Sequence, residues 1–356
     1  MRVLTVVGNR PQFVKAAAVS RALRERAEEV LVHTGQHYDD EMSAVFFTEL
    51  GVPRPARELD LGTGSNTEQT ARMLSALAPI VADARPDVVL VYGDTNSTLA
   101  GGLAAAQAQV PVAHVEAGMR SFDRRMPEEL NRVLTDHLSS LLLCSSEAPA
   151  EHLRAERIAG AVEVVGDVMV DVARLVQPRA RADDAPLRDA GVRAGEYVLV
   201  TAHRAGNVDD PDRLAALVDL LLALPLPAVL PLHPRTGARL DAAGLLDRLL
   251  QADHIRVTPP LGYLAFTALL TRARAMLTDS GGVQKEAYLA GVPCVTLRDT
   301  TEWTETVDVG WNVLVDLDRD AALRALDRTP PEARPELYGD GHAGERVVEA
   351  LVRAYG

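Results

Sequence analysis

Carboxylates and cations follow several apolar segments of this sequence, where they could transfer protons or bind an anion. Asp94 comes directly after DVVLVYG, and Glu116 follows VPVAHV, an apolar strand in which a charge needs a partner or a task. Glu128 and Arg132 are four residues apart, so they share one face of a helix that begins near Pro127. Simpler interpretations stay open, because Asp94 could cap the next helix and Glu128 could form a surface ion pair with Arg132.

The segment GNRPQFVK, residues 8–15, has the pattern of a strand-to-helix turn in which Arg10 and Lys15 could contact phosphate oxygens. It has neither Walker-loop spacing nor a G-x-G-x-x-G fingerprint, so neither nucleoside triphosphate nor dinucleotide binding follows. A turn with surface cations is the alternative. Of 37 basic residues only Lys15 and Lys285 are lysines, which favours a function for Lys15.

The segment TDSGGVQKEAY passes from an apolar strand through Ser280, Gly281 and Gly282 into an amphipathic helix. Open backbone amides at a helix start suit a diphosphate. Glu286, one turn inside that helix, suits bidentate hydrogen bonds to a ribose diol. A ligand with both phosphate and sugar would explain the segment, and a plain glycine-rich turn is the alternative.

Two histidines, His203 and His233, each follow an apolar strand. Such a pair makes a zinc site conceivable, but no third ligand stands at a recognisable spacing. We therefore expect no metal.

Short apolar runs alternate with helical stretches along the chain, which indicates an α/β protein whose parallel sheets are covered on both faces. The polar segment 177–196 lacks strand character and is expected to connect two domains. We therefore predict two doubly wound, Rossmann-like domains, residues 1–170 and 171–342. Polar residues beyond the carboxyl ends of parallel strands face a ligand crevice, so two such edges would form one polar cleft between the domains.

Composition excludes several classes of function. Apolar residues make up 47% and charged residues 24% of 356 residues, as in globular proteins, and the net charge of −13 makes nucleic acid an unexpected partner. Cys144 and Cys294 lie in apolar runs without metal spacing, which favours a reducing cytoplasm. No signal peptide is visible, and the longest apolar stretch, 214–234, contains Asp219 and several prolines, so no membrane span is expected.

Together these motifs resemble the non-hydrolysing UDP-N-acetylglucosamine 2-epimerase family. The match runs from GNRP to YGDGHAGERVVEAL and covers almost the whole chain. The resemblance implies the GT-B architecture, with the active site in the cleft between the two domains and a C-terminal helix, 343–356, packed back on the first. It also implies a cytoplasmic homodimer, a UDP-sugar substrate, no metal and no other cofactor, and as a default a role in supplying polysaccharide precursors.

The implied reaction interconverts UDP-N-acetylglucosamine and UDP-N-acetylmannosamine by elimination and re-addition of UDP through a 2-acetamidoglucal. By position, Asp94, Glu116 and Glu128 match the family's essential acidic residues, and His203 matches the histidine that assists the departure of UDP. Which carboxylate removes the proton stays open. The candidate substrate-binding residues are Arg10, Lys15, Arg132, His233, Ser280, Gly281, Gly282 and Glu286.

The chain departs from the family pattern after His203. Members usually read His-Arg-Arg-Glu-Asn or His-Arg-Ala-Glu-Asn there, whereas this chain has Ala205 and Gly206 in the third and fourth places. Ala205 lacks the second arginine that in some members helps to hold an activating UDP-N-acetylglucosamine. The other matches to that regulatory region are Gln36, His37 and Gln69. Retention of allosteric activation and a modified sugar are both left open.

Three other functions remain as alternatives. A hydrolysing epimerase would release UDP irreversibly, and a GT-B glycosyltransferase would need an acceptor and would leave the three carboxylates unexplained. A sugar-nucleotide-binding paralogue without catalysis would bind the nucleotide but exchange no proton at carbon 2.

Overall fold

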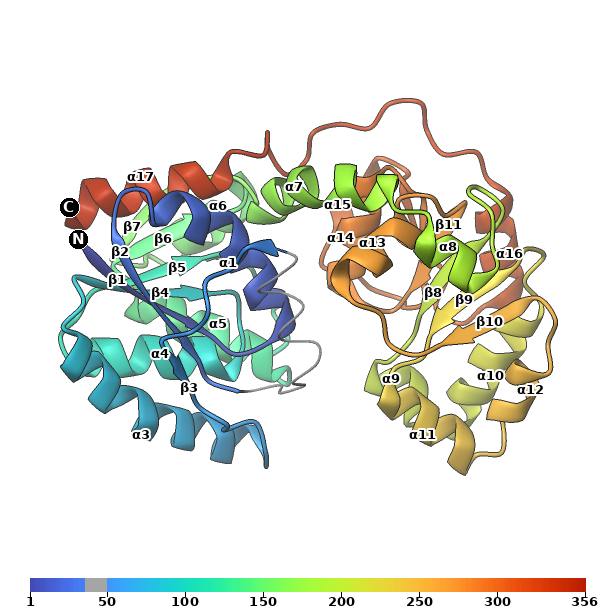
Figure 1. Cartoon of the computed structure of the whole chain (residues 1–356), viewed down its shortest axis with the longest axis horizontal. Helices are drawn as coiled ribbons and strands as arrows, with labels where there is room; N and C mark the ends of the chain where they lie inside the picture. Colours follow the sequence, from blue (N-terminus) through green and yellow to red (C-terminus); the bar gives the residue numbers. More distant parts are fainter. Residues whose placement is uncertain (36–49) are drawn as a thin grey trace. The chain divides into compact units, whose positions relative to one another are not determined.

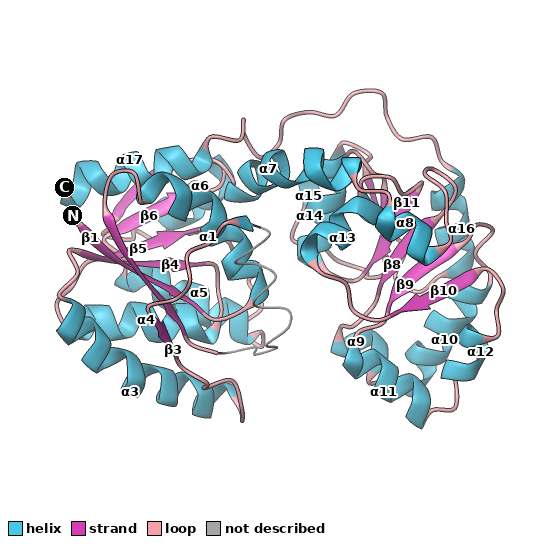
Figure 2. Ribbon diagram, in the orientation of Figure 1, coloured by secondary structure: helices cyan, strands magenta, loops and turns pink. Residues whose placement is uncertain are grey.

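The computed structural model describes residues 1–35 and 50–356, and of Arg10 only the backbone. The chain forms two compact units, residues 1–174 with 338–356 and residues 175–337 (Figure 1). In each unit helices cover a central sheet (Figure 2). The division falls inside one helix, so segment 177–196 contains the end of that helix and a second short one.

The first unit has a seven-stranded sheet in the order β3-β2-β1-β4-β5-β6-β7, with every pairing parallel. The strands are β1 (Arg2–Val7), β2 (Glu28–His33), β3 (Arg57–Glu58), β4 (Val88–Tyr92), β5 (Val112–Val115), β6 (Leu141–Cys144) and β7 (Ala161–Val164). The helices are α1 (Arg10–Leu23), α3 (Asn66–Ala84), α4 (Asn96–Gln107), α5 (Pro127–Leu138), α6 (Glu147–Ala155), α7 (Val168–Ala182) and α17 (Ala343–Tyr355).

The second unit has a six-stranded parallel sheet in the order β10-β9-β8-β11-β12-β13. The strands are β8 (Val198–Thr201), β9 (Ala228–Pro231), β10 (Ile255–Thr258), β11 (Ala275–Thr278), β12 (Cys294–Thr296) and β13 (Asn312–Leu314). The helices are α8 (Ala185–Ala190), α9 (Ala205–Val208), α10 (Pro211–Leu222), α11 (Pro234–Ala242), α12 (Leu246–Leu250), α13 (Tyr263–Leu270), α14 (Gly281–Ala290), α15 (Thr304–Asp308) and α16 (Arg319–Asp327).

Burial explains the apolar runs of the sequence. All five residues of β4 are buried, as expected for a central strand with helices on both faces. Helix α4 is rich in small residues because it lies close to the sheet: a Cβ on Gly101 would stand 3.2 Å from side-chain atoms of Val6 and Val91. Met73 and Leu77 of α3 belong to the same hydrophobic core as residues of β1, β4 and α4.

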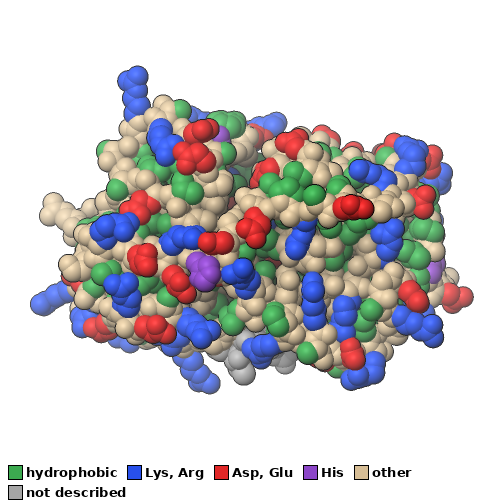
Figure 3. All heavy atoms as spheres, turned by 90° about the horizontal axis from the view of Figure 1, so that it is seen from above, with side chains coloured by type: hydrophobic (Ala, Val, Ile, Leu, Met, Phe, Trp, Pro, Cys, Tyr) green, Lys and Arg blue, Asp and Glu red, His purple; other side chains and the backbone are tan. Residues whose placement is uncertain are grey.

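The last helix returns to the first unit, where α17 packs against α1. Its first two amides, of Ala343 and Gly344, donate to the Asp171 carboxylate at 3.1 and 2.8 Å. Within the described ranges, no helix combines the length and apolar character that a bilayer-spanning segment needs. Acidic and basic side chains are interspersed over the face in Figure 3.

Strand order sets where ligands bind in such sheets. In the first unit the order reverses between β1 and β4, and in the second between β8 and β11. Crevices at the carboxyl ends of open α/β sheets form at these switch points. A site at these switch points would be formed by the residues that follow the four strands: Gly8-Asn9, Gly93-Asp94, His203-Arg204 and Asp279-Ser280.

Candidate active site

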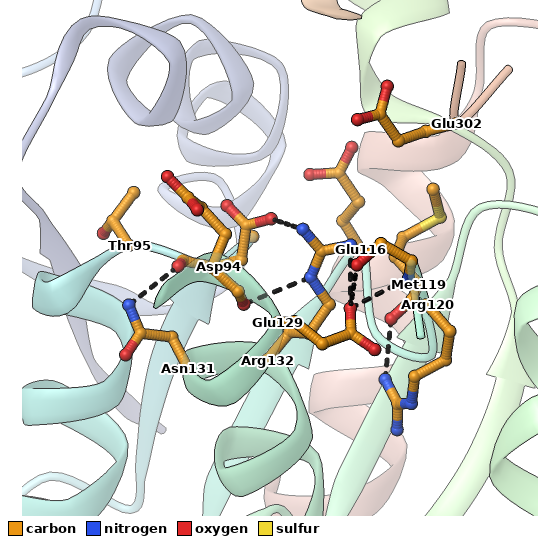
Figure 4. A network of polar contacts seen from close by, with 12 residues as sticks. Asp94, Thr95, Glu116, Met119, Arg120, Glu129, Asn131, Arg132 and Glu302 are labelled. Atoms are coloured by element: carbon orange, nitrogen blue, oxygen red, sulfur yellow. Dashed lines mark hydrogen bonds and ion pairs between the residues drawn. The ribbon is translucent and has the colours of Figure 1, made fainter. Parts of the chain in front are cut away.

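Asp94 lies just beyond β4 and forms an ion pair with Arg132 of α5. The Arg132 Nη2 donates to Asp94 Oδ2 at 2.5 Å, and Figure 4 shows the two side chains pointing toward one another. Thr95, not Asp94, caps α4, because its hydroxyl accepts from the Thr98 amide. The capping interpretation of Asp94 is therefore wrong, and its carboxylate pairs with Arg132 instead.

Burial raises the pKa of the Asp94 carboxyl, since protein atoms surround it on most sides although 35% of its side-chain surface still meets solvent. The positive charges of Arg132 and Lys15 lower this pKa, whereas the negative charges of Glu116 and Glu128 raise it. The net direction is upward. A carboxyl shifted toward neutrality is suited to give and take a proton.

Glu116 follows β5 and pairs with Lys15 of α1. The Lys15 ammonium contacts Glu116 Oε2, and both side chains are mostly buried. Gly93 lies against this pair, because a Cβ there would stand 3.3 Å from both charged atoms. Glu116 itself has a φ of 68°, in the left-handed region that is uncommon for a residue with a side chain.

The two adjacent glutamates at the start of α5 differ in environment. Glu128 is exposed, whereas Glu129 is buried and accepts from the amides of Ser121 and Phe122 at 2.8 and 3.0 Å. Arg132 donates to the backbone oxygen of Glu128 at 3.2 Å and lies 3.7 Å from the Glu129 carboxylate. The Glu128 and Arg132 side chains, both of which the structure describes, form no ion pair with each other; Arg132 pairs with Asp94 and Glu129 instead.

A buried charge network lies behind the carboxylates, and its members were not identified from the sequence. The two ring nitrogens of His114 contact Asp136 Oδ1 at 2.7 Å and the Gly93 carbonyl oxygen at 2.6 Å. Asp136 Oδ2 also accepts from Arg120 Nη1 at 2.7 Å, and Arg120 in turn forms two 2.7 Å hydrogen bonds with Glu156. Burial alone would raise the pKa of Asp136, but His114 and Arg120 outweigh it and lower that pKa.

Side-chain amides form a second contact chain toward Asp94. Gln69 of α3 donates to the backbone oxygens of Gly62 and Gly64 and accepts from Asn96 Nδ2 at 3.1 Å. Asn131 of α5 donates to Asn96 Oδ1 at 3.1 Å and to the Asp94 backbone oxygen at 3.0 Å. Gln69 is thus connected to the Asp94 turn.

Three candidates lie partly or wholly outside what the structure describes. Gln36 and His37 fall outside the described residues. Arg10 begins α1 beside the N-cap Asn9, and its side chain is likewise not described.

His203 and His233 come together in the second unit. Their rings stack with centroids 5.5 Å apart and an interplanar angle of 28°. Asp279, which follows β11, is fully buried and accepts from the backbone amides of His203 and Arg204 at 3.0 Å, while its Oδ1 lies 3.8 Å from His203 Nδ1. His233 Nδ1 accepts from the Arg235 amide at 3.2 Å.

The strand-to-helix turn predicted around Ser280 is present, and α14 begins at Gly281. The Ser280 side chain makes no capping hydrogen bond to the first turn of the helix. A Cβ on Gly282 would meet nothing within 4 Å, whereas one on Gly281 would stand 3.2 Å from a Glu302 carboxylate oxygen. Glu286 lies in the second turn and is partly buried. The turn therefore has room beside Gly282 and a carboxylate beside Gly281.

Lys285, the second lysine, is buried with its ammonium 4.3 Å from the centre of the Trp303 ring. This cation–π contact gives it a packing role.

Gly206 of α9, where the chain departs from the family pattern, is exposed, and a Cβ there would meet no atom within 4 Å.

Comparison with known proteins decides the family. Residues 21–352 match the sequence model of UDP-N-acetylglucosamine 2-epimerase. The chain belongs to this family. A UDP-N-acetylglucosamine 2-epimerase homolog of Methanococcus maripaludis is 43% identical over 354 residues, 99% of each chain. The UDP-2,3-diacetamido-2,3-dideoxy-D-glucuronate 2-epimerase of Pseudomonas aeruginosa is 45% identical over 365 residues, 99% of this chain and 100% of that one.

Solved structures of epimerases share the fold. The Methanocaldococcus jannaschii UDP-N-acetylglucosamine 2-epimerase in complex with UDP-N-acetylglucosamine and UDP superposes with a TM-score of 0.91 at 40% identity, covering both chains completely. The Neisseria meningitidis enzyme bound to UDP-N-acetylglucosamine gives 0.87 at 30% identity, over 99% of this chain and 100% of that one. The predicted GT-B-like class, with two Rossmann-like parallel-sheet domains, is confirmed.

Proposed function

We propose that this epimerase interconverts UDP-N-acetylglucosamine and UDP-N-acetylmannosamine without hydrolysis, by eliminating UDP and adding it back. One observation carries the proposal: Asp94 and Glu116 follow neighbouring parallel strands, and each is paired with a cation, Arg132 and Lys15. Paired carboxylates and cations at one sheet edge suit proton transfer next to a charged leaving group.

The chemistry needs a base, an acid and stabilisation of the leaving diphosphate. A carboxylate removes the proton from carbon 2, and the electron pair of that C–H bond forms the double bond between carbons 1 and 2. The bond from carbon 1 to the UDP oxygen breaks with both electrons on the diphosphate. Protonation of carbon 2 on the other face and return of UDP to carbon 1 give the epimer. The raised pKa of Asp94 suits a group that must change between these roles.

The residues of the second unit are proposed to bind UDP. The amides at the start of α14, beside Ser280 and Gly282, would bind the diphosphate, and Glu286 would bind the ribose hydroxyls. His203 would support the departing diphosphate, since Asp279 fixes its backbone and His233 stacks on its ring.

A second substrate deserves direct comparison. The Pseudomonas aeruginosa relative, at 45% identity over nearly the full length of both chains, is named for UDP-2,3-diacetamido-2,3-dideoxy-D-glucuronate. The same carbon-2 chemistry would serve this sugar, because it also carries an acetamido group at carbon 2. The open position at Gly206 is compatible with a changed sugar or regulatory pocket.

The test is proton NMR in deuterated water, without added metal or NAD, on each of the two sugar nucleotides in turn. Deuterium at carbon 2 together with the epimeric UDP-sugar supports the proposal and identifies the substrate. Asp94→Asn and Glu116→Gln should each suppress the exchange. Irreversible release of UDP and free sugar would instead indicate a hydrolysing epimerase. Transfer of sugar only when an acceptor is added would indicate a glycosyltransferase, and binding without exchange a catalytically silent paralogue.

We also propose a cytoplasmic homodimer. It is supported by an exposed apolar pair on α5 of the first unit, Leu130 and Leu134, which are one helical turn apart and are 47% and 50% exposed as whole residues. Both cysteines are free thiols buried in strands, as suits a reducing compartment.

A further inference from the structure

The peptide unit that precedes Asp94 is held by a buried histidine. The Gly93 carbonyl and the Asp94 amide belong to the same peptide, and His114 Nε2 lies 2.6 Å from that carbonyl oxygen. The next carbonyl, of Asp94 itself, accepts from Asn131 Nδ2 at 3.0 Å (Figure 4). Two successive peptides are therefore fixed by side chains from two other elements, β5 and α5.

The contacts of His114 hold its ring at both nitrogens. A carbonyl oxygen can only accept, so Nε2 must carry a hydrogen. Asp136 has a second oxygen that accepts from Arg120 at 2.7 Å and from the Gly118 amide at 3.2 Å, which identifies it as an ionised acceptor. Nδ1 of His114 lies 2.7 Å from the other oxygen. The fully buried ring is therefore held on both sides, at Nδ1 by Asp136 and at Nε2 by the Gly93 carbonyl.

This arrangement connects the elements that carry the acidic residues. The His114 side chain comes from β5, two residues before Glu116, and Asp136 comes from α5, which carries Glu128. Through Gly93 the histidine reaches the end of β4, where Asp94 begins the turn. A rigid buried connection of this kind is what keeps reacting groups within the small tolerance that catalysis allows.

We propose that His114 is a positioning residue, which places the Asp94 carboxylate for reaction by donating a hydrogen bond from Nε2 to the Gly93 carbonyl while Asp136 fixes its ring. It touches no substrate and acts only through the Gly93–Asp94 peptide. The kinetic part of this inference rests on the proposed epimerase function, whereas the structural part does not.

Two substitutions separate the two ring contacts. The amide of His114→Gln reaches the position of Nε2 and can still donate to the Gly93 oxygen, but it loses Asp136. The amide of His114→Asn reaches the position of Nδ1 and can still donate to Asp136, but it leaves the Gly93 oxygen without its donor. Each variant loses one buried hydrogen bond, and the one lost by His114→Gln, to a carboxylate, costs the fold at least as much as the one lost by His114→Asn, to a carbonyl. A larger loss of kcat in His114→Asn therefore does not follow from stability.

The expected result is an asymmetry in kcat. His114→Asn should lower kcat for carbon-2 exchange by about 30-fold or more, with KM changed less than about threefold, because a small displacement of a reacting group is costly. His114→Gln should keep at least about ten times the kcat of His114→Asn. Thermal unfolding should find His114→Asn no less stable than His114→Gln.

A second readout needs no activity. In protein labelled with ¹⁵N-aspartate, the amide signal of Asp94 reports directly on the hydrogen bond to the Gly93 oxygen in the same peptide. This signal should move in His114→Asn and stay near its wild-type position in His114→Gln. If the wild type exchanges no proton on either sugar nucleotide but the amide signal shows this asymmetry, the proposed function fails and the positioning contact stands.

Either of two results would overturn the inference. One is an equal loss of kcat in both variants that follows their loss of stability, with the Asp94 amide moving equally in both. The other is His114→Asn acting on KM alone.

Discussion

Replacing Arg132 by methionine should remove the cation that Asp94 and Glu129 share while keeping a side chain of similar length. The Arg132 side chain is 8% exposed and donates to Asp94 at 2.5 Å, so the substitution removes the nearest counter-charge of a carboxylate that is only partly exposed and leaves it the more distant Lys15. Glu129 loses a weaker partner at 3.7 Å but keeps its hydrogen bonds to the loop at Ser121. The main effect should therefore arise at Asp94.

The size of the effect follows from how far the pair is buried. Breaking a fully buried ion pair costs roughly 3–5 kcal/mol, whereas an exposed pair contributes about 0–1 kcal/mol. Asp94 keeps a third of its surface in solvent, so we expect unfolding free energy to fall by about 2 kcal/mol. The same loss in transition-state stabilisation would lower kcat/KM by about 30-fold.

The pH dependence gives the sharper test. Burial raises the pKa of Asp94 above its unfolded value, so its contribution to stability is present below the unfolded pKa and lost as pH rises through the folded pKa. Arg132 opposes that rise, and its removal should raise the folded pKa further. The destabilisation by Arg132→Met should therefore be small where carboxyls are protonated and reach its full size near neutral pH.

Urea unfolding at an acidic and at a neutral pH measures this difference. Arg125→Met is the matched control, because Arg125 is an arginine just ahead of the same helix that pairs with Asp123 and is 91% exposed. An equal destabilisation by Arg132→Met at both pH values, or one no larger than that of the control, would refute the reasoning.

Three other changes have definite expected outcomes. Lys15→Met should remove the ammonium that pairs with the mostly buried Glu116 carboxylate and lower the free energy of unfolding by about 2–3 kcal/mol in urea titrations. Lys15→Arg should be less harmful, and equal effects of the two substitutions would contradict this. Gly206→Glu should leave thermal stability unchanged or raise it by about 0.5–1 kcal/mol, because the site is open and glycine is a poor helix residue, so a clear fall in Tm would count against it. Glutamate at both Leu130 and Leu134 should convert the proposed dimer to a monomer in light scattering after size exclusion, and an unchanged mass would place the interface elsewhere.

The sequence could predict that residues directly after strands lie near one another, because a parallel sheet brings the carboxyl ends of its strands to one edge. Asp94 and Glu116 follow apolar runs that pair as β4 and β5, so their proximity needs only the order of the strands. The turn at Ser280 could be located for the same reason, since its glycines and the strand before it are contiguous in the chain.

Pairings across elements could not be predicted in this way. The spacing of Glu128 and Arg132 suggested a pair along the helix, but Arg132 faces inward, where Asp94 lies. His114 is recognisable in the sequence as a titratable residue inside an apolar strand. Its partner Asp136, however, lies 22 residues later on α5, and no local spacing links the two. Local spacing cannot show which of two adjacent glutamates at a helix start is buried. Glu129 is the buried one because its carboxylate accepts from the amides of the preceding loop at Ser121 and Phe122.

The scarcity of lysine has a consequence for labelling chemistry. Apart from the N-terminus, the chain offers amine-directed reagents only two targets, and Lys285 is buried against Trp303. Lys15 is ion-paired with Glu116 and mostly buried, but the 15% of its side chain that is exposed makes it the more accessible of the two lysines to an acylating probe. Its acylation, followed by mass spectrometry, would report occupancy of the carboxylate cluster from a single peptide, with almost no background from the rest of the surface.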